Sequence, residues 1–154
     1  ISTCGVIEGI ERFSHEPEQF TLAVSLHAAR QSTRDLLMPR VARYKLPDLK
    51  QALMRYVKKT NRRVTLEYVM IDNVNDTDRD LEALNAFCSD LLCHVNLIPI
   101  NAVEGSPFQP SDPLVLDQWV QSIQSHGKEA TVRDSRGSDI DGACGQLKRT
   151  KCFT

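Results

Sequence analysis

Short runs of aliphatic and β-branched residues alternate with longer segments of helical periodicity along the chain. Between positions 46 and 59, apolar side chains recur every three or four residues, which is the spacing of an amphipathic helix. Similar patterns predict helices over 5–14, 78–92 and 114–125, strands over 21–26, 63–71, 93–98 and 130–133, and the end of another strand at 1–3. Strands that alternate with helices of crossover length predict parallel β/α units and therefore an α/β fold.

The length of the chain limits what these units can build. Its 154 residues suit one domain and fall well short of the roughly 250 residues of a full eight-unit β/α barrel. Lys and Arg number 19 against 20 Asp and Glu, which argues against a protein that binds phosphates over its whole surface. No apolar run approaches the about 18 residues of a membrane helix. Because the chain begins with Ile1, at the end of a predicted strand, we expect further sequence in front of it.

The cysteines favour a reducing compartment. They stand at positions 4, 88, 93, 144 and 152, an odd number with no C-x-x-C pair, so neither a disulfide framework nor a zinc ribbon is indicated. Zinc binding by Cys88, Cys93 and His94 is conceivable, but neighbours in a strand point to opposite faces, so Cys93 and His94 cannot easily share an ion. With no secretory leader either, the sequence predicts a cytoplasmic protein without metal ligands of its own.

Polar side chains gather where the predicted strands end. In parallel β/α proteins these ends meet at one rim, where ligands bind. Each residue also has an ordinary alternative role as a helix cap, a turn residue, a hydrogen-bonded structural histidine or part of a surface ion pair, and the residues between 72 and 76 fit turn chemistry best. Together they predict a site for a polar ligand with several functional groups. The residues concerned are Ser2, Thr3, Ser25, His27, Asp72, Asn73, Asn75, Asp76, Asn101, Arg133, Ser135, Arg136 and Asp139.

Cys144 differs from the other cysteines in its surroundings. It lies between Ala143 and Gly145, after the last predicted strand, with Arg133 and Arg136 nearby in sequence. Small neighbours leave a thiol accessible, and positive charge favours its thiolate. On these grounds alone, a reactive thiol and a packed one are equally open alternatives. The chain contains no nucleophile elbow, P-loop, dinucleotide-binding fingerprint or H-E-x-x-H motif.

Several separate stretches, in this order, resemble the C-terminal part of the radical S-adenosylmethionine RNA adenosine methylases, the RlmN/Cfr family. The match covers nearly the whole chain, and the last stretch is the most specific. The stretches are Ile1–Gly5, Leu22–Ala28, Leu66–Met70, Val74–Asp76, Val95–Pro99 with Asn101, and Arg136–Gly137 with Asp139–Ile140 and Ala143–Leu147.

The resemblance implies a partial parallel β/α barrel, of which this chain would be the C-terminal half. It also implies that S-adenosylmethionine lies across the strand ends in contact with Ser2, Ser25, Leu26, His27 and Asn101. Cys144 corresponds to a cysteine that is itself methylated by one S-adenosylmethionine. A 4Fe–4S cluster then cleaves a second one to a 5′-deoxyadenosyl radical, which activates that methyl group for addition to an adenine ring carbon. A second cysteine releases the product by closing a disulfide, and a base removes the ring proton.

The chain also departs from the family pattern. The C-x3-C-x2-C cluster motif and the Gly-Glu-Pro stretch are absent, as are the resolving cysteine and the base. The chain has Ala29–Gln31 where the family usually shows Pro-Asn-Asp, and 101–105 lack the usual Asn-Pro-x-Pro-Gly. We therefore interpret residues 1–147 as the C-terminal part of the catalytic domain and 148–154 as a tail. The missing N-terminal half would be the partner of this piece, which we expect to be inactive alone and prone to self-association through its first strand.

The resemblance implies methylation of adenine C2 in 23S rRNA by the full-length protein, with tRNA as a further candidate substrate. Methylation of C8 is the alternative within the family, and the sequence does not decide between them. Two other classes of function remain open: a nucleotide- or metabolite-binding α/β module without radical chemistry, and a thiol-redox enzyme that uses Cys144. A cluster motif upstream of Ile1 would favour the methylase, and activity independent of S-adenosylmethionine would favour the redox enzyme.

Overall fold

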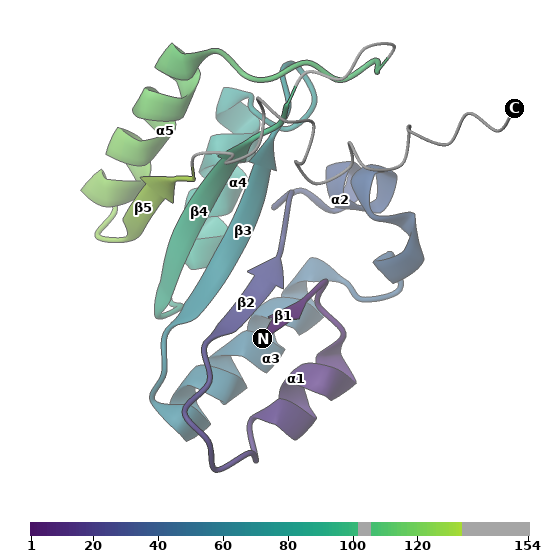
Figure 1. The fold of residues 1–154 in the computed structure, drawn as a ribbon, viewed down its shortest axis with the longest axis vertical. Coiled ribbons are helices and arrows are strands. Elements are labelled where there is room, and N and C mark those ends of the chain that lie inside the picture. Colours follow the sequence, from purple (N-terminus) through teal and green to yellow (C-terminus); the bar gives the residue numbers. More distant parts are fainter. Residues whose placement is uncertain (102–105, 134–154) are drawn as a thin grey trace, which may run out of the picture.

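The computed structural model describes residues 1–101 and 106–133 (Figure 1). Five strands form one sheet in the order β1-β2-β3-β4-β5, and every neighbouring pair is parallel. The sequence therefore predicted the α/β class and the parallel strands correctly. The strands are β1 (Ser2–Thr3), β2 (Leu22–Ser25), β3 (Val64–Met70), β4 (Cys93–Pro99) and β5 (Glu129–Val132).

Helices connect successive strands. They are α1 (Ile7–Phe13), α2 (Gln31–Leu37), α3 (Leu46–Thr60), α4 (Asp78–Cys88) and α5 (Pro113–Ser125), with a 3-10 turn at Pro39–Val41. The sequence pattern missed α2, because its buried positions are Thr33 and Arg34 rather than an apolar stripe. It also extended α4 to residue 92, whereas the helix ends at Cys88, where the carbonyl accepts a hydrogen bond from the Leu91 amide at 3.0 Å in the turn before β4.

One face of the sheet is buried beneath the helices. Side chains alternate along each strand, and those on the covered face include Val24, Leu66, Tyr68 and Val95, all fully buried. Helices α3 and α4 lie behind the sheet in Figure 1. Trp119 of α5 packs on Tyr68, with ring centroids 5.3 Å apart. Each strand lies beside the next strand in the sequence, and the crossover connections between them all have the same handedness. The helices therefore lie on a single face of the sheet, as in a barrel rather than a doubly wound sheet.

The opposite face, which we call the polar face, carries half-buried side chains instead. On β2, β3 and β4 these are the residues between the core positions. The strand register sets three of them in one row across the sheet, with Ser25 paired to Glu67 and Glu67 to Asn96, and the exposed Thr131 of β5 continues the row beside Asn96. Such a row of polar groups on the inner side of a curved parallel sheet can bind a ligand without exposing the core. Within the described residues, none of the helices has the length and apolar character needed to span a membrane.

Candidate functional site at the strand ends

The segment from Ser25 to His27 continues β2 at the end where the strands finish. Ser25 Oγ donates a hydrogen bond to Glu67 Oε2 at 3.4 Å. The amides of Leu26 and His27 both donate to the carbonyl of Glu67, at 2.9 and 3.1 Å. The Leu26 side chain is fully buried in the core, so only its backbone can meet a ligand on the polar face. Ser25 and His27, two of the predicted ligand contacts, thus lie close together.

His27 adopts a left-handed backbone conformation, with φ at 56°. Residues with a Cβ occupy this region at a cost of about 1 kcal/mol or more, so the surrounding hydrogen bonds must hold it there. One of them fixes the ring: the amide of Val69 donates to Nδ1 at 3.2 Å. Burial lowers the pKa of His27. The charge of Glu67 opposes this lowering, and the charge of Arg34 adds to it. A neutral ring with Nδ1 engaged carries its proton on Nε2, which can therefore donate to a ligand.

Asn75 joins the ends of β2 and β3. Its Nδ2 donates to the carbonyls of His27 and Val69, at 2.7 and 2.6 Å, and its Oδ1 accepts from the amide of Ile71 at 2.8 Å. The hydroxyl of Tyr68 donates to the Asn75 carbonyl at 2.7 Å. Asn75 is fully buried, and its side-chain polar groups therefore need partners inside the protein. These bonds engage both its amide nitrogen and its amide oxygen. Sequence reasoning grouped Asn75 with turn residues and missed that it holds His27 in place.

The turn residues around Asn75 are as the sequence predicted. The amide of Asn73 donates to Asp76 Oδ1 at 2.9 Å, and Asn73 has a φ of 55°. Asn73 Nδ2 donates to the carboxylate of Asp72 at 2.8 Å in an exposed setting. These three residues build the turn, whereas Asn75 points inward.

The remaining polar residues form linked pairs along the polar face. Arg133 Nη1 lies 3.6 Å from Glu67 Oε1. Thr131 Oγ1 donates to Asn96 Oδ1 at 2.7 Å, and its hydroxyl lies 2.8 Å from His94 Nε2. His94 is half-buried here while its neighbour Cys93 is buried on the opposite face, as the strand alternation predicted.

The other predicted ligand contacts lie on neighbouring strands. Ser2 is exposed in β1 beside Ala23 of β2. Thr3 Oγ1 accepts hydrogen bonds from the amides of Gly5 and Val6, at 3.2 and 3.4 Å, and so closes the turn after β1. Asn101 is half-buried two residues after the end of β4. Cys144, Ser135, Arg136 and Asp139 lie outside the described residues.

A buried arginine lies between the ends of β1 and β2. Arg34 of α2 is fully buried, and its Nη2 donates to the carbonyl of Cys4 at 2.8 Å. Gly5 allows this close approach: its φ is 95°, and a Cβ there would lie 3.0 Å from Nη2. Nε and Nη1 of Arg34 have no partner among the described residues. The buried charge of Arg34 contributes to the lowered pKa of His27.

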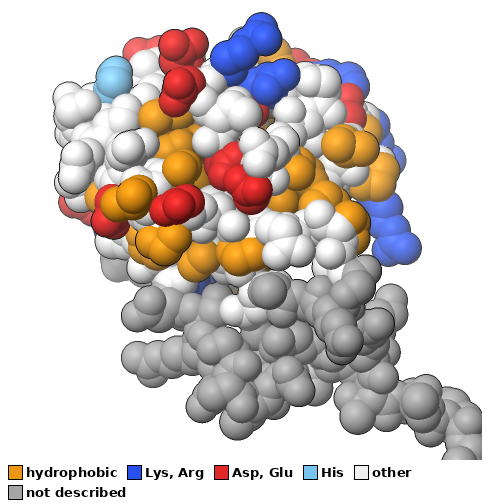
Figure 2. All heavy atoms as spheres, turned by 90° about the horizontal axis from the view of Figure 1, so that it is seen from above, with side chains coloured by type: hydrophobic (Ala, Val, Ile, Leu, Met, Phe, Trp, Pro, Cys, Tyr) orange, Lys and Arg blue, Asp and Glu red, His pale blue; other side chains and the backbone are white. Residues whose placement is uncertain are grey.

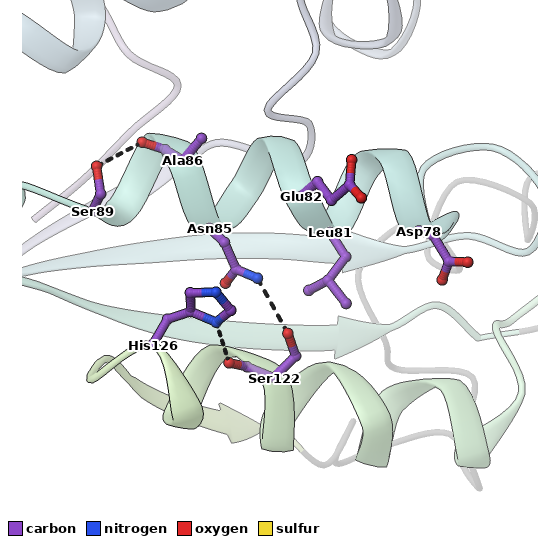
Figure 3. A pocket seen from close by; sticks show the side chains of 8 residues that line it. All are labelled: Asp78, Leu81, Glu82, Asn85, Ala86, Ser89, Ser122 and His126. Atoms are coloured by element: carbon purple, nitrogen blue, oxygen red, sulfur yellow. Dashed lines mark hydrogen bonds between the residues drawn. The ribbon is translucent and has the colours of Figure 1, made fainter.

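Two further features lie away from this end. Cys88 and Cys93 are buried where α4 ends and β4 begins, and no set of three potential metal ligands occurs in residues 1–101 and 106–133. A hollow of about 600 Å³ lies between α4 and α5 on the outer side (Figure 3), where Asn85 donates to Ser122 at 3.2 Å. None of the predicted ligand contacts lines this hollow.

Viewed from above, onto the end where the strands finish, the described surface carries Asp, Glu and hydrophobic side chains together (Figure 2). Lys and Arg side chains lie toward the margins of this view. A surface that offers polar and apolar groups side by side suits a ligand with several functional groups better than a simple anion.

Comparison with known proteins gives one consistent result. No protein-family model matches the chain. It is 47% identical over 148 residues to a probable dual-specificity RNA methyltransferase RlmN from Moorella thermoacetica, covering 96% of this chain and 42% of the relative. The protein with that same description from Thermobifida fusca is 44% identical over 147 residues, covering 96% and 40%. The chain thus spans about two fifths of the length of the curated relatives it matches.

Solved structures agree. A radical SAM methyltransferase from Sphaerobacter thermophilus superposes with a TM-score of 0.90 at 47% identity, over 94% of this chain and 42% of that one. A domain of pyruvate-formate lyase-activating enzyme from Bacteroides vulgatus gives a TM-score of 0.62 at 16% identity, over 82% and 74%. The second likeness shows the fold alone. Together they confirm the predicted partial parallel β/α barrel.

Proposed function

We propose that this chain, a homologue of a C-terminal portion of RlmN proteins, is the later part of the catalytic domain of a radical S-adenosylmethionine RNA methyltransferase. The full-length protein would methylate adenine C2 in 23S rRNA, with tRNA as a further candidate substrate and methylation of C8 as the alternative. The observation that carries the proposal is the similarity along nearly the whole chain to relatives described as RNA methyltransferases. We also propose a cytoplasmic location, for which the sequence argument from the cysteines is the only support.

The polar face suits S-adenosylmethionine. That ligand carries ammonium, carboxylate, ribose and adenine groups, which need donors and acceptors in fixed places. His27 Nε2 can donate a hydrogen bond to the ligand, and Ser25 Oγ and Asn96 can accept one from it. The backbone of Leu26 lies between Ser25 and His27. We propose Ser2, Ser25, Leu26, His27 and Asn101 as its contacts. Their positions at the ends or edges of β1, β2 and β4 support this assignment.

The described residues do not provide ligands for a 4Fe–4S cluster. Cys88 and Cys93 lie together at the far end of β4, and Cys4 is half-buried after β1 without neighbouring cysteines in its turn. We propose that the cluster is bound by the part of the protein outside this chain. A cluster supplies one-electron chemistry, which an adenine ring carbon requires because it is a poor nucleophile for ordinary methyl transfer.

We propose that Cys144 carries the methyl group. Its thiolate sulfur would attack the methyl carbon of one S-adenosylmethionine, forming a sulfur–carbon bond as the methyl–sulfonium bond breaks, with S-adenosylhomocysteine as the leaving group. We also keep the division into residues 1–147, as the end of the catalytic domain, and a tail over 148–154. The missing N-terminal half would complete the site.

Full-length protein, reconstituted anaerobically with iron and sulfide, tests this function. We expect it to methylate an adenosine in ribosomal RNA, with digestion to nucleosides and mass spectrometry separating 2-methyladenosine from 8-methyladenosine. Cys144→Ala should abolish the product, while the matched control Cys152→Ala should retain activity within about twofold. Full activity in Cys144→Ala would refute the role of this cysteine. Binding of S-adenosylmethionine without any methylated RNA would favour the binding module instead.

A further inference from the structure

Glu67 lies in the middle of the row of polar residues across the sheet and contacts the Ser25–His27 segment of the proposed site as well as Arg133. Its carboxylate is shared between two side chains: Oε2 accepts from Ser25 Oγ at 3.4 Å, and Oε1 lies 3.6 Å from Arg133 Nη1. Its backbone carbonyl accepts from the amides of both Leu26 and His27. One residue of β3 therefore fixes the whole Ser25–His27 segment at the end of β2.

The burial of Glu67 strengthens these contacts. Its side chain is 20% exposed, whereas that of Arg133 is 62% exposed. A partly buried carboxylate is screened less by water than a surface one, so its bond to Ser25 holds the hydroxyl in one orientation. Because Arg133 faces the other carboxylate oxygen, the charge of Glu67 is balanced within the protein.

The hydrogen-bond directions determine what Ser25 and His27 can offer a ligand. Since the Ser25 hydroxyl donates its proton to Glu67, its remaining lone pairs can only accept. Since His27 Nδ1 accepts from the Val69 amide, the neutral ring can only donate, through Nε2. The site thus presents an acceptor at Ser25 and a donor at His27.

We propose that Glu67 is a positioning residue that makes Ser25 an obligate hydrogen-bond acceptor and holds it beside the donor His27, so that the site selects a ligand with an N–H or O–H group next to an acceptor. This inference rests on the proposed function for its ligand, S-adenosylmethionine. Glu67 acts through Ser25 and His27 rather than by touching the ligand.

The test uses the full-length protein and the variants Glu67→Gln, Ser25→Ala and the double variant. A glutamine amide keeps the shape but can donate to Ser25, which frees the hydroxyl to turn. We expect Glu67→Gln to weaken S-adenosylmethionine binding about tenfold in calorimetry, and to have less than a twofold effect when Ser25 is already Ala. Thr65→Val is the matched control: it lies on the same strand and face, and no hydrogen bond of its hydroxyl occurs in the described part of the chain.

A second readout separates positioning from general stability. Glu67 and Arg34 are the charged groups that act on His27, and Glu67 opposes the lowering of the His27 pKa. NMR titration of the His27 ring should therefore show a lower pKa in Glu67→Gln than in wild type or Thr65→Val. The proposal would be overturned if Glu67→Gln left the affinity for S-adenosylmethionine unchanged. It would also be overturned if the loss of affinity in the double variant equalled the product of the losses in the two single variants. If the wild type binds no S-adenosylmethionine, the proposed function fails, and an unchanged His27 pKa in Glu67→Gln then overturns the positioning role independently.

Discussion

Replacing Asn75 with Ala should loosen the end of the sheet that presents His27. The change removes three side-chain hydrogen bonds in a site with 0% exposure. It leaves the partly buried carbonyls of His27 and Val69, and the buried amide of Ile71, without these partners. Each bond contributes about 1 kcal/mol net, and each orphaned group costs about 1–3 kcal/mol before water enters, so we expect a local loss of about 3–5 kcal/mol.

Hydrogen–deuterium exchange of the full-length protein measures this loss where it occurs. Amides in the segment 64–76 should exchange roughly a hundredfold or more faster in Asn75→Ala, because about 1.4 kcal/mol corresponds to a factor of ten. Asn75→Asp should lose at least as much at neutral pH, since it turns a carboxylate toward the carbonyls of His27 and Val69.

The matched control is Asn73→Gly in the same turn. Glycine accepts the left-handed backbone of Asn73 without strain, and only one exposed hydrogen bond is lost. We expect its exchange to stay within about threefold of wild type. Exchange in Asn75→Ala that matches this control would refute the view that Asn75 holds the two strand ends together.

Three further outcomes follow from the described contacts. Burial lowers the pKa of His27 in the folded state, so the unfolded state takes up a proton first as the pH falls, and the free energy of unfolding should decrease as the pH drops below about 6.5. Asn tolerates the left-handed backbone at this position, so His27→Asn should flatten this part of the pH dependence measured by urea unfolding. An unaltered pH dependence in His27→Asn would contradict the effect of burial. Asp112 caps α5 by accepting from the Leu114 amide at 2.8 Å, so Asp112→Ala should cost about 1 kcal/mol, against about 0.5 kcal/mol or less for the exposed Asp117→Ala, and equal melting temperatures would count against the cap. Trp119→Ala should cost about 3–5 kcal/mol and Trp119→Phe clearly less, as measured by urea unfolding, and a mild effect of Ala would show that the α5 contact with the sheet is loose.

The sequence was sufficient where local pattern and topology act together. Strand alternation predicts which residues of β3 and β4 face the core. Because parallel strands end at one edge, the sequence also places Ser25 and His27 together at that edge. The stripe of α3 was equally clear, because Leu49 and Leu53 recur at helical spacing and are both fully buried. These features need no knowledge of distant contacts.

Other features depend on partners far away in the sequence. Asn75 looks like its turn neighbours, and only the fold shows that its amide reaches the His27 carbonyl 48 residues earlier. Helix α2 escaped prediction because Arg34 is buried against the carbonyl of Cys4, 30 residues away, which no hydrophobic pattern reveals. The contact between Ser25 and Glu67, on which the proposed role of Glu67 rests, depends on the register between β2 and β3, which the packing of the sheet determines.

In the proposed mechanism, the sulfur of Cys144 carries the methyl group. The most direct test is to incubate anaerobically reconstituted full-length protein with S-adenosylmethionine deuterated in its methyl group, and to locate the label by tandem mass spectrometry of the digested protein. We expect a deuterated methyl group on Cys144, absent from Cys144→Ala and from Cys152. In a second incubation with ribosomal RNA added, deuterated methyladenosine formed by Cys144→Ala, with no label on the protein, would contradict this role of Cys144.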